Sequence, residues 1–453
     1  MSNTTPSSKP SISLVVLGHV DHGKSTTLGH FLFELGTVDQ RAMEKFESEA
    51  EALRMSSWKW AFVLDSLPEE RERGLTEDIA FYPFETPNRR FLLIDAPGHR
   101  DFVKNALRGA AQADACILMV SANPGDLKAG LKVGGGEGDP GGQTREHAIL
   151  ASVLGVQEVC IAINKMDTVE YSEGQYKATV GAVKDLLQEI QSPWVKALEK
   201  IPFVPISGFK GINLVKSSAE LSWYKGPTLL EALDSMKPAA TRKDLPLRVI
   251  VQDAYERPGV GTVVDGRVVS GTLRVGINVL VQPGGESGSV KEIWGIGGIS
   301  IPELQSGEHG AINLQGISKP VLEYPGLVIG IDDTSFNVAD LISTRLLILE
   351  TLGRPITPGT NFVMHIGTAF ASAQVASIDA IDQENPRFKK MPRKNPATGA
   401  LNLAFPGELA TVTLQPSQAM VVESFQEHPI LGRVILRHMG TTVAVGIVQQ
   451  VKK

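Results

Sequence analysis

The sequence predicts an α/β domain, with a mostly parallel sheet and helices on both faces, followed by two all-β barrel domains. Over the first 240 residues, short apolar runs alternate with longer stretches whose apolar residues have helical spacing. A charged connector flanked by prolines occupies residues 237–246, and helical patterns almost vanish after it. The length of 453 residues, at roughly 150 residues per domain, agrees with about three domains.

The α/β domain is predicted from strands and helices that alternate along the chain. Five apolar runs have the character of buried strands, at residues 12–17, 90–94, 115–120, 159–163 and 203–206. Four intervening segments have the length and the Ala, Leu, Glu and Lys content of helices, at residues 26–36, 101–113, 143–154 and 173–191. This alternation is typical of parallel strands joined by crossover helices. We therefore assign residues 1–240 to the α/β domain.

One segment of this domain, residues 130–142, has seven glycines in thirteen residues and no periodicity. Glycine-rich chain of this kind is flexible and does not form a core. A functional loop and a solvated insertion are both compatible with it, and we expect a mobile, solvated surface loop.

The rest of the chain has the pattern of β barrels. Runs of five or six residues that are rich in Val and Ile are broken by Gly pairs and by Pro-Gly, as at residues 258–259 and 283–285. Turn signals restart after Asp332 and Asp333, so two barrels explain the pattern better than one large sheet. We place the first barrel at residues 244–336 and the second at residues 337–453.

The composition excludes several classes of protein. Apolar residues at 42% and charged residues at 21% are close to those of folded globular proteins, which excludes a disordered or fibrous chain. No segment approaches the roughly 18 continuous apolar residues of a membrane span, and the first ten residues have no apolar signal core. Cys116 and Cys160 each lie in a strand-like apolar run, where we expect buried thiols and not a disulfide. A cytoplasmic protein is the expectation.

A phosphate-binding loop is predicted at the end of the first strand, where residues 18–25 match the pattern G-x-x-x-x-G-K-[ST]. Such a loop turns backbone N–H groups and a helix N-terminus toward phosphates, and its lysine reaches the β and γ oxygens. An incidental Gly-rich turn is the alternative, but the strand and helix on either side favour nucleotide binding. We expect His19 and His22 to be spacers. The predicted contacts are Gly18, His19, Val20, Asp21, His22, Gly23, Lys24, Ser25 and Thr26.

Magnesium is expected beside this loop. Ser25 offers a hydroxyl, and Asp95, at the end of the second strand, can hold the ion through water. Thr76 offers a hydroxyl and a carbonyl to the same ion, and Gly98 can donate its N–H to a γ-phosphate. Asp95 could also make only a turn, but the Gly-Lys-Ser loop makes a site more plausible.

The base is predicted from the residues that follow the strand at 159–163. Guanine presents two adjacent donors, which one carboxylate accepts together, whereas adenine presents an acceptor there. The nucleotide is therefore GTP, read by Asp167, with Asn164 and Lys165 in the same motif. Ser207, Gly208 and Phe209 follow another strand and would donate backbone N–H groups to the guanine oxygen.

These motifs resemble those of the translation elongation factor 1-alpha family of GTPases. The matching segments are Gly18-His-Val-Asp-His-Gly-Lys-Ser25, Glu70-Arg-Glu-Arg-Gly-Leu-Thr76, Asp95-Ala-Pro-Gly-His-Arg-Asp-Phe102, Gln143-Thr-Arg-Glu-His147 and Asn164-Lys-Met-Asp167. The resemblance continues to residues 442–446, so it covers essentially the whole chain. It implies a GTPase domain before two β barrels, and a GTP form that carries a tRNA or a tRNA-shaped protein to the ribosome. It also implies that His99 orients the attacking water and that Val20 belongs to an apolar gate that restrains His99.

The resemblance leaves the cargo open. Residues 293–298 replace a His-rich or acidic stretch that lies near the aminoacyl end of tRNA in the elongation factors. Residues 307–316 and 354–359 look as much like the related termination and ribosome-rescue GTPases, although the long N-terminal extension of those relatives is not seen. We expect delivery of aminoacyl-tRNA to the ribosomal A site, with a tRNA-mimicking release or rescue factor as the alternative. A GTPase subunit of the sulfurylase type is a remote alternative.

The expected partners follow from this interpretation. They are the ribosome and the cargo, with no membrane, and the resemblance leaves a guanine nucleotide exchange factor open. The net charge of −6 gives no global electrostatic case for nucleic acid, so RNA must be met through local patches. One such patch is the basic run at residues 387–394, where Phe388 could stack on a base; a solvated loop is the alternative.

Overall fold

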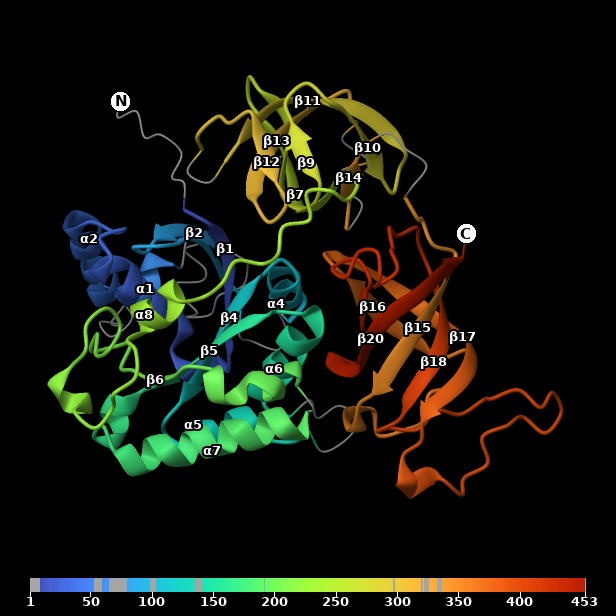
Figure 1. Cartoon of the computed structure of the whole chain (residues 1–453), viewed down its shortest axis with the longest axis horizontal. Helices are drawn as coiled ribbons and strands as arrows, with labels where there is room; N and C mark the ends of the chain where they lie inside the picture. Colours follow the sequence, from blue (N-terminus) through green and yellow to red (C-terminus); the bar gives the residue numbers. More distant parts are fainter. Residues whose placement is uncertain are drawn as a thin grey trace. The chain divides into compact units, whose positions relative to one another are not determined.

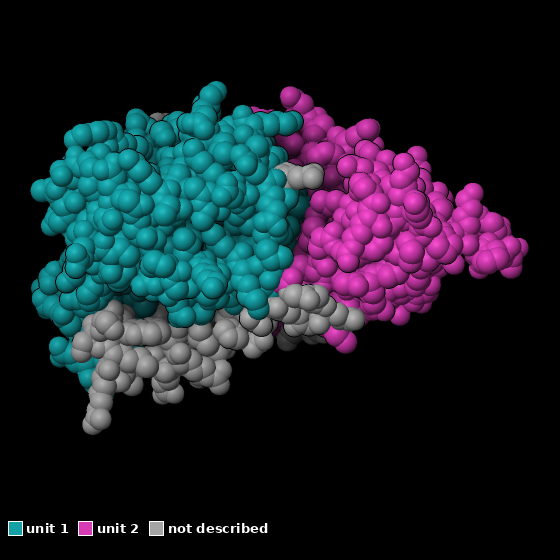
Figure 2. All heavy atoms as spheres, turned by 90° about the horizontal axis from the view of Figure 1, so that it is seen from below, with its two compact units in different colours: residues 1–133, 141–239 teal, residues 134–140, 240–453 magenta. Residues whose placement is uncertain are grey.

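The structure is a computed structural model in which two compact units can be described (Figure 2). One unit comprises residues 1–133 and 141–239, and the other comprises residues 134–140 and 240–453. The described residues are 9–52, 59–64, 80–97, 103–134, 141–190, 192–295, 298–318, 321, 326–331 and 336–452.

A six-stranded sheet forms the centre of the first unit (Figure 1). Its strands are β1 (Ser11–Gly18), β2 (Ala80–Glu85), β3 (Arg90–Asp95), β4 (Ala115–Ser121), β5 (Glu158–Asn164) and β6 (Phe203–Pro205). Their order is β2-β3-β1-β4-β5-β6, and every pair except β2 with β3 is parallel. The chain moves to one side of β1 to form β3 and to the other side to form β4. The loop after β1 therefore lies at the switch point where α/β sheets bind ligands.

Helices cover both faces of this sheet (Figure 1). They are α1 (Lys24–Glu34), α2 (Gln40–Ala52), α4 (Val103–Ala110), α5 (Pro124–Leu131), α6 (Gln143–Leu154), α7 (Glu173–Glu189) and α8 (Leu229–Asp234). Alternate strand residues point to opposite faces: Leu118 packs in one core with α4, α5, α6 and α7, and Ile117 packs in another with α1 and α8. The four predicted helices correspond to α1, α4, α6 and α7.

Strand β2 is the one strand of this sheet that the sequence pattern does not reveal. It contains Pro83, which cannot donate a ladder hydrogen bond, and proline argues against a central strand. In the structure β2 is an antiparallel edge strand that pairs only with β3, and Pro83 lies opposite Leu92. An edge position leaves one side of the strand without a partner, so the missing N–H is tolerated there.

The second unit begins with a closed antiparallel barrel of order β10-β11-β13-β8-β7-β14, beside which β9 and β12 pair. The strands are β7 (Arg248–Arg257), β8 (Gly261–Ser270), β9 (Thr272–Arg274), β10 (Asn278–Gln282), β11 (Glu286–Trp294), β12 (Glu303–Gln305), β13 (His309–Gln315) and β14 (Val328–Gly330). Inward-facing Val, Leu and Ile residues fill this barrel, including Val264, Val281 and Ile312.

A second closed antiparallel barrel follows, of order β15-β18-β17-β16-β19-β20. The strands are β15 (Leu341–Ile348), β16 (Asn361–Ile366), β17 (Ala369–Gln383), β18 (Leu409–Pro416), β19 (Arg433–His438) and β20 (Thr441–Lys452). The predicted fold class, an α/β domain and then two barrels, is confirmed, whereas the residue boundaries of the three domains stay a prediction.

The two barrels contact each other through buried polar side chains. Arg248 of the first barrel forms an ion pair with Glu423 of the second at 3.3 Å, and both side chains are buried. Thr368 donates a hydrogen bond to the Val251 carbonyl at 3.1 Å. Among the described residues, no helix is both long and apolar enough to cross a membrane.

Candidate functional site

The structure gathers the described parts of the predicted site at one edge of the sheet. Parallel strands β1, β3 and β5 end there at Gly18, Asp95 and Asn164, and Ser207 follows β6. Strands that are parallel bring their carboxyl ends to the same edge, so residues that are far apart in sequence meet. Thr76, Gly98 and His99, which were also predicted for this site, lie outside the described residues.

The loop after β1 ends at Gly23, which caps α1. Gly23 has φ of 79°, a left-handed conformation that side chains disfavour. A Cβ at Gly23 would lie 2.6 Å from the Asn164 amide nitrogen, so a larger residue would also clash. Lys24, Ser25 and Thr26 follow in the first turn of α1, where N–H groups have no partner within the helix. This is the geometry of an anion-binding helix N-terminus.

Lys24 is buried and its ammonium group faces back into the loop. Nζ donates to the Gly18 carbonyl at 3.1 Å and to the His19 carbonyl at 3.0 Å. Burial lowers the pKa of Lys24 to about 8, although the charges of Asp95 and Asp21 act in the opposite direction. An anion beside this ammonium group would offset the desolvation, so the site is electrostatically suited to phosphate.

Helix α6 braces the first part of the loop with three side chains. The backbone N–H of Gly18 donates to His147 Nδ1 at 3.0 Å, that of His19 to Thr144 Oγ1 at 3.2 Å, and that of Val20 to Gln143 Oε1 at 3.2 Å. Of the N–H groups that follow in the loop, that of His22 donates to the His19 carbonyl at 3.2 Å. The segment 143–147 could be predicted only as a family motif. Nothing in its spacing indicates contact with the loop after β1, about 125 residues earlier in the chain.

His22 is not the spacer that the sequence suggested. Its side chain is fully buried, and its ring nitrogens lie 3.1 Å from the Met119 carbonyl and 3.2 Å from the Asp126 carbonyl. Burial, more than any other effect, lowers the pKa of His22 to about 4, so the ring is neutral at pH 7. His22 ties the loop to the ends of β4 and α5. Spacing could not show this, since a histidine in a loop is more often exposed.

The glycine-rich segment 130–142 is packed at both ends. Gly130 and Gly142 are buried, and a Cβ on Gly142 would lie 2.1 Å from the Gly130 carbonyl oxygen. A Cβ on Gly130 would lie 2.7 Å from the His22 ring. These glycines therefore permit close backbone approach beside the loop, and the prediction of a solvated insertion is wrong for them. Residues 135–140 lie outside the described residues.

Two of the predicted magnesium residues are described. Asp95 is 1% exposed at the end of β3, and its charge acts on Lys24. Ser25 lies in the first turn of α1. A hydroxyl and a carboxylate are hard oxygen donors of the kind that Mg²⁺ accepts, and Mg²⁺ commonly takes one or two protein oxygens together with phosphates and water. The donor set fits the ion.

The base-reading residues form a hydrogen-bonded unit. Asn164 donates to the His22 carbonyl at 2.9 Å and accepts from the Gly208 N–H at 2.9 Å. Asp167 Oδ1 accepts from the Ser207 hydroxyl at 2.6 Å. Lys165 has φ of 61° and forms an ion pair with Asp126 at 2.8 Å. Phe209 is 43% exposed, so its side chain packs little, as expected if only its backbone acts.

Comparison with known proteins finds relatives that match nearly the whole chain. The model of the "Elongation factor Tu GTP binding domain" matches residues 9–239, and that of the "GTP-eEF1A C-terminal domain-like" family matches residues 342–449. Elongation factor 1-alpha of Ignicoccus hospitalis is 42% identical over 448 residues, which cover 98% of this chain and 97% of the relative.

Solved structures agree in fold. The Ski7 GTPase-like domain of S. cerevisiae, bound to GTP, has a TM-score of 0.77 at 18% identity, with 97% of each chain covered. A bacterial selenocysteine-specific elongation factor has a TM-score of 0.65 at 21% identity; the match covers 97% of this chain but 58% of that one. Because the similarity to curated relatives spans nearly the whole sequence, the chain belongs to the elongation factor 1-alpha family of translation factors and is a GTPase.

Proposed function

We propose that this protein, in its GTP form, delivers aminoacyl-tRNA to the A site of the ribosome in the cytoplasm. One observation carries the proposal: the loop, the lysine and the guanine-reading residues lie together at one sheet edge, in a chain that is 42% identical to an elongation factor 1-alpha over almost its full length. The relatives bear the name of a factor that acts in elongation. The ribosome, the tRNA and an exchange factor belong to this proposal.

The nucleotide is held in three parts. The loop at residues 18–26 takes the phosphates, Ser25 and Asp95 take Mg²⁺ with Thr76, and Asp167 with residues 207–209 reads guanine. Mg²⁺, when bound, neutralises charge that develops on the β and γ oxygens. The role of the chain's own residues is to position the phosphates and to exclude adenine, since phosphoryl transfer depends almost entirely on positioning and electrostatics.

Hydrolysis is assigned to a water that His99 orients toward the γ-phosphate, with Val20 in the gate that restrains His99. The water oxygen bonds to phosphorus as the bond to the β-phosphate oxygen breaks. If His99 acts on water alone, His99→Ala should leave GTP affinity nearly unchanged, while ribosome-stimulated turnover falls by orders of magnitude. Joint loss of affinity and turnover would instead assign His99 a structural role.

In the basic run at residues 387–394, the lysines are exposed, whereas Arg393 and Phe388 make contacts within the barrel. Arg393 donates to Glu408 at 2.7 Å through each of two guanidinium nitrogens, and Phe388 stacks on Phe405 with ring centroids 4.7 Å apart. One face of the Phe388 ring is covered by Phe405, so stacking on a base is left to the other face and stays a prediction. Lys389 and Lys390 are exposed on the same loop. Phosphate contacts by such lysines would make binding salt-dependent.

The decisive experiment is protection of the aminoacyl ester. The GTP-bound protein should slow hydrolysis of aminoacyl-tRNA at micromolar protein and low salt. Replacing Lys389, Lys390 and Lys394 together by Gln should reduce the dependence of affinity on salt, whereas Lys196→Gln, an exposed lysine of the GTPase domain, serves as the control. If no protection is found, the tRNA proposal fails.

A release or rescue factor is the second candidate cargo. The observation that favours it is Trp294, which ends β11 where the elongation factors carry a different stretch, and which lies under Arg257 with 5.4 Å between the guanidinium carbon and the ring centroid. By the resemblance, the stretch at this position lies near the aminoacyl end of tRNA in the elongation factors, so a different stretch argues against an aminoacyl pocket like theirs. A pull-down with a non-hydrolysable GTP analogue that recovers a tRNA-shaped protein would favour this cargo.

A further inference from the structure

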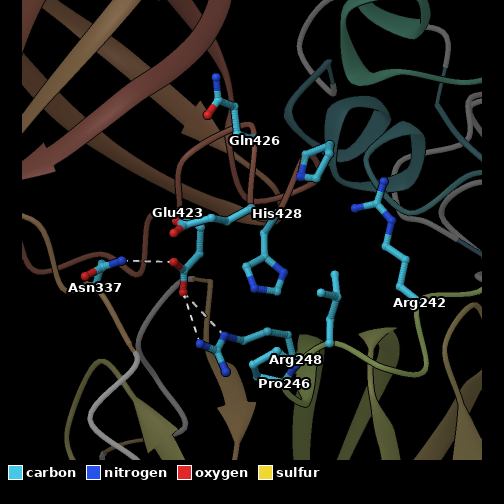
Figure 3. Close-up of a pocket in the computed structure, with 10 residues that line it drawn as sticks. Arg242, Pro246, Arg248, Asn337, Glu423, Gln426 and His428 are labelled. Carbon is cyan, nitrogen blue, oxygen red and sulfur yellow. Dashed lines mark hydrogen bonds and ion pairs between the residues drawn. The ribbon is translucent and has the colours of Figure 1, made fainter.

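A pocket of about 430 Å³ lies where the two barrels meet, and all of its lining residues belong to the second unit (Figure 3). Its charged lining residues are Arg242, Arg248, Glu423 and Glu427, and His428 adds a polar ring. Apolar surface is supplied by Leu245, Pro246 and Pro429. A pocket of this volume, with an apolar lining and a few polar groups, has the character of a small-molecule site.

One wall of the pocket is a fixed ion pair. Arg248 and Glu423 side chains are 2% and 3% exposed, and Asn337 donates to the other Glu423 oxygen at 3.0 Å. The Arg248 guanidinium also lies 4.3 Å from the centroid of the Phe336 ring. Glu423 accepts hydrogen bonds from both Arg248 and Asn337, so its carboxylate is already paired within the protein (Figure 3).

His428 points into the pocket without a hydrogen-bond partner. The residue is 7% exposed, and its ring forms no hydrogen bond with any part of the chain that the structure describes. Figure 3 shows the ring directed toward the hollow between Arg248 and Arg242. Burial and then the positive charges of Arg248 and Arg242 lower the pKa of His428 to about 4, against the charge of Glu427. The ring nitrogens are open to the pocket, where they can hydrogen-bond with water or with a ligand atom.

The Arg242 side chain is not paired with an acid in the part of the chain that the structure describes. Its backbone is held by a hydrogen bond to Ser306, but its guanidinium forms no ion pair or hydrogen bond within the described ranges. The other acid of the lining, Glu427, accepts a hydrogen bond from the Ser424 hydroxyl at 2.8 Å. Burial, and then the charge of Arg242, lower the pKa of the neighbouring Arg433 to about 10. An unpaired guanidinium beside the His428 ring offers N–H donors to a negatively charged guest.

We propose that this pocket binds a small organic anion, whose single carboxylate or phosphate group is held by Arg242 and His428 and whose apolar body packs on Leu245 and Pro246. Guanidinium is suited to both oxyanions through parallel N–H bonds. The neutral imidazole donates one further N–H. The ion pair of Arg248 and Glu423 keeps the wall in place and takes no part in binding.

The test uses the full chain saturated with GDP and Mg²⁺, so that the nucleotide loop cannot take the anion. The probes are benzoate and phenyl phosphate, with benzamide as an uncharged analogue of benzoate. The readout is the ring signals of histidine in a ¹H–¹³C spectrum of ring-labelled protein, with His428 assigned by the signal that is lost in His428→Gln. Each probe is added to about 10 mM, at which a Kd of about 1 mM gives nearly full occupancy.

We expect benzoate, phenyl phosphate or both to shift the His428 signals, benzamide to shift them little, and Arg242→Gln to weaken binding by about tenfold or more. Which of the two anions binds better distinguishes a carboxylate from a phosphate guest. The control is Arg274→Gln, an exposed arginine of β9 that pairs with Glu303. No shift with either anion, an equal shift with benzamide, or an equal loss in both arginine variants would overturn the proposal. Unchanged ring signals of His309, His365 and His438, which lie in the two barrels, verify that Arg242→Gln is folded.

Discussion

The side-chain oxygen of Asn164 accepts a hydrogen bond from the backbone N–H of Gly208 at 2.9 Å. Through its amide nitrogen the same side chain donates to the His22 carbonyl and to the Thr27 hydroxyl. One asparagine thus joins the phosphate loop, the end of β5 and the guanine loop. We expect a change at one of these segments to affect the other two, because a shift of the asparagine would leave buried groups without their partners.

Nucleotide choice should depend on Asp167. Asp167→Asn keeps an oxygen for the Ser207 hydroxyl but loses the carboxylate that pairs with the two guanine donors. We expect GTP affinity to fall by about 10- to 150-fold and binding of xanthosine nucleotides to appear, since the oxygen at C2 of xanthine can accept from the new amide. Fluorescence titration measures both. Asp185→Asn, on the exposed side of α7, is the control, and equal affinity of the unaltered protein for ATP and GTP would contradict the assignment.

Nucleotide affinity should decline at alkaline pH. Burial lowers the pKa of Lys24 to about 8 in the nucleotide-free protein, and a bound phosphate raises it by favouring the charged form. The lysine is therefore protonated in both states below about pH 7, and affinity falls as pH rises through 8 toward the higher pKa of the complex, by at most about tenfold per unit. Titration of GDP across this range measures the slope. Lys24→Arg, which stays protonated, should remove it, and a slope that persists would implicate another group.

The brace from α6 should slow nucleotide release. His147→Ala leaves the Gly18 N–H buried without its acceptor, which costs about 1–3 kcal/mol and should speed GDP dissociation by about 5- to 150-fold if the loop relaxes. His147→Asn places an oxygen near the position of Nδ1 and should restore slow release. Stopped-flow with a fluorescent GDP analogue gives the rates. Arg145→Ala, which removes only an exposed ion pair with Glu189, should behave as the unaltered protein, and an equal effect there would refute the brace.

The pairing of Arg393 with Glu408 should stabilise the second barrel. Glu408 is fully buried, and burial alone would raise its pKa, but hydrogen bonds from Arg393 and from the N–H groups of Phe405 and Asn385 hold it below the ordinary value. Arg393→Met should therefore destabilise the barrel by about 3–5 kcal/mol at pH 7, because a buried charge is left unpaired.

A lowered carboxyl pKa means that this contribution is present above the ordinary pKa of about 4.5 and is lost as pH falls through the folded-state value. The difference between the unaltered protein and Arg393→Met in denaturant should shrink in acid. Arg387→Met, on the same loop but over the Phe388 ring, is the control. A difference that is constant from neutral pH into acid would show that the pair does not act through charge.

Sequence reasoning predicted the elements whose signals are local. The loop at residues 18–25 has a glycine where φ is positive and a lysine where the helix begins. Its residue pattern therefore predicts its conformation directly. The strand ends that carry Asp95 and Asn164 follow from the parallel topology. By contrast, β2 was not predicted, because Pro83 argues against a strand unless the strand lies at an edge. The buried state of His22 was not predicted either, because it depends on backbone carbonyls far away in the sequence.

The contacts that were not predicted share one property, which is that neither partner signals the other. Gln143 and His147 were noted only as part of a family motif on a predicted helix, and their contact with the loop after β1 appears once the fold brings β1 beside α6. Phe388 read as an exposed aromatic in a basic run until Phe405, 17 positions later, is found stacked on it. Tertiary contacts of this kind follow from packing and not from local propensity, so only the structure reveals them.

The ion pair of Arg248 and Glu423 has a consequence for the exchange of parts between relatives. Each barrel supplies one member of a buried pair of opposite charges, so each is matched to the other and not only to itself. A chimaera that takes one barrel from a relative without the corresponding arginine or glutamate would bury a lone charge at the junction, a defect of several kcal/mol. The two barrels are therefore expected to be inherited, transplanted and redesigned as a single module.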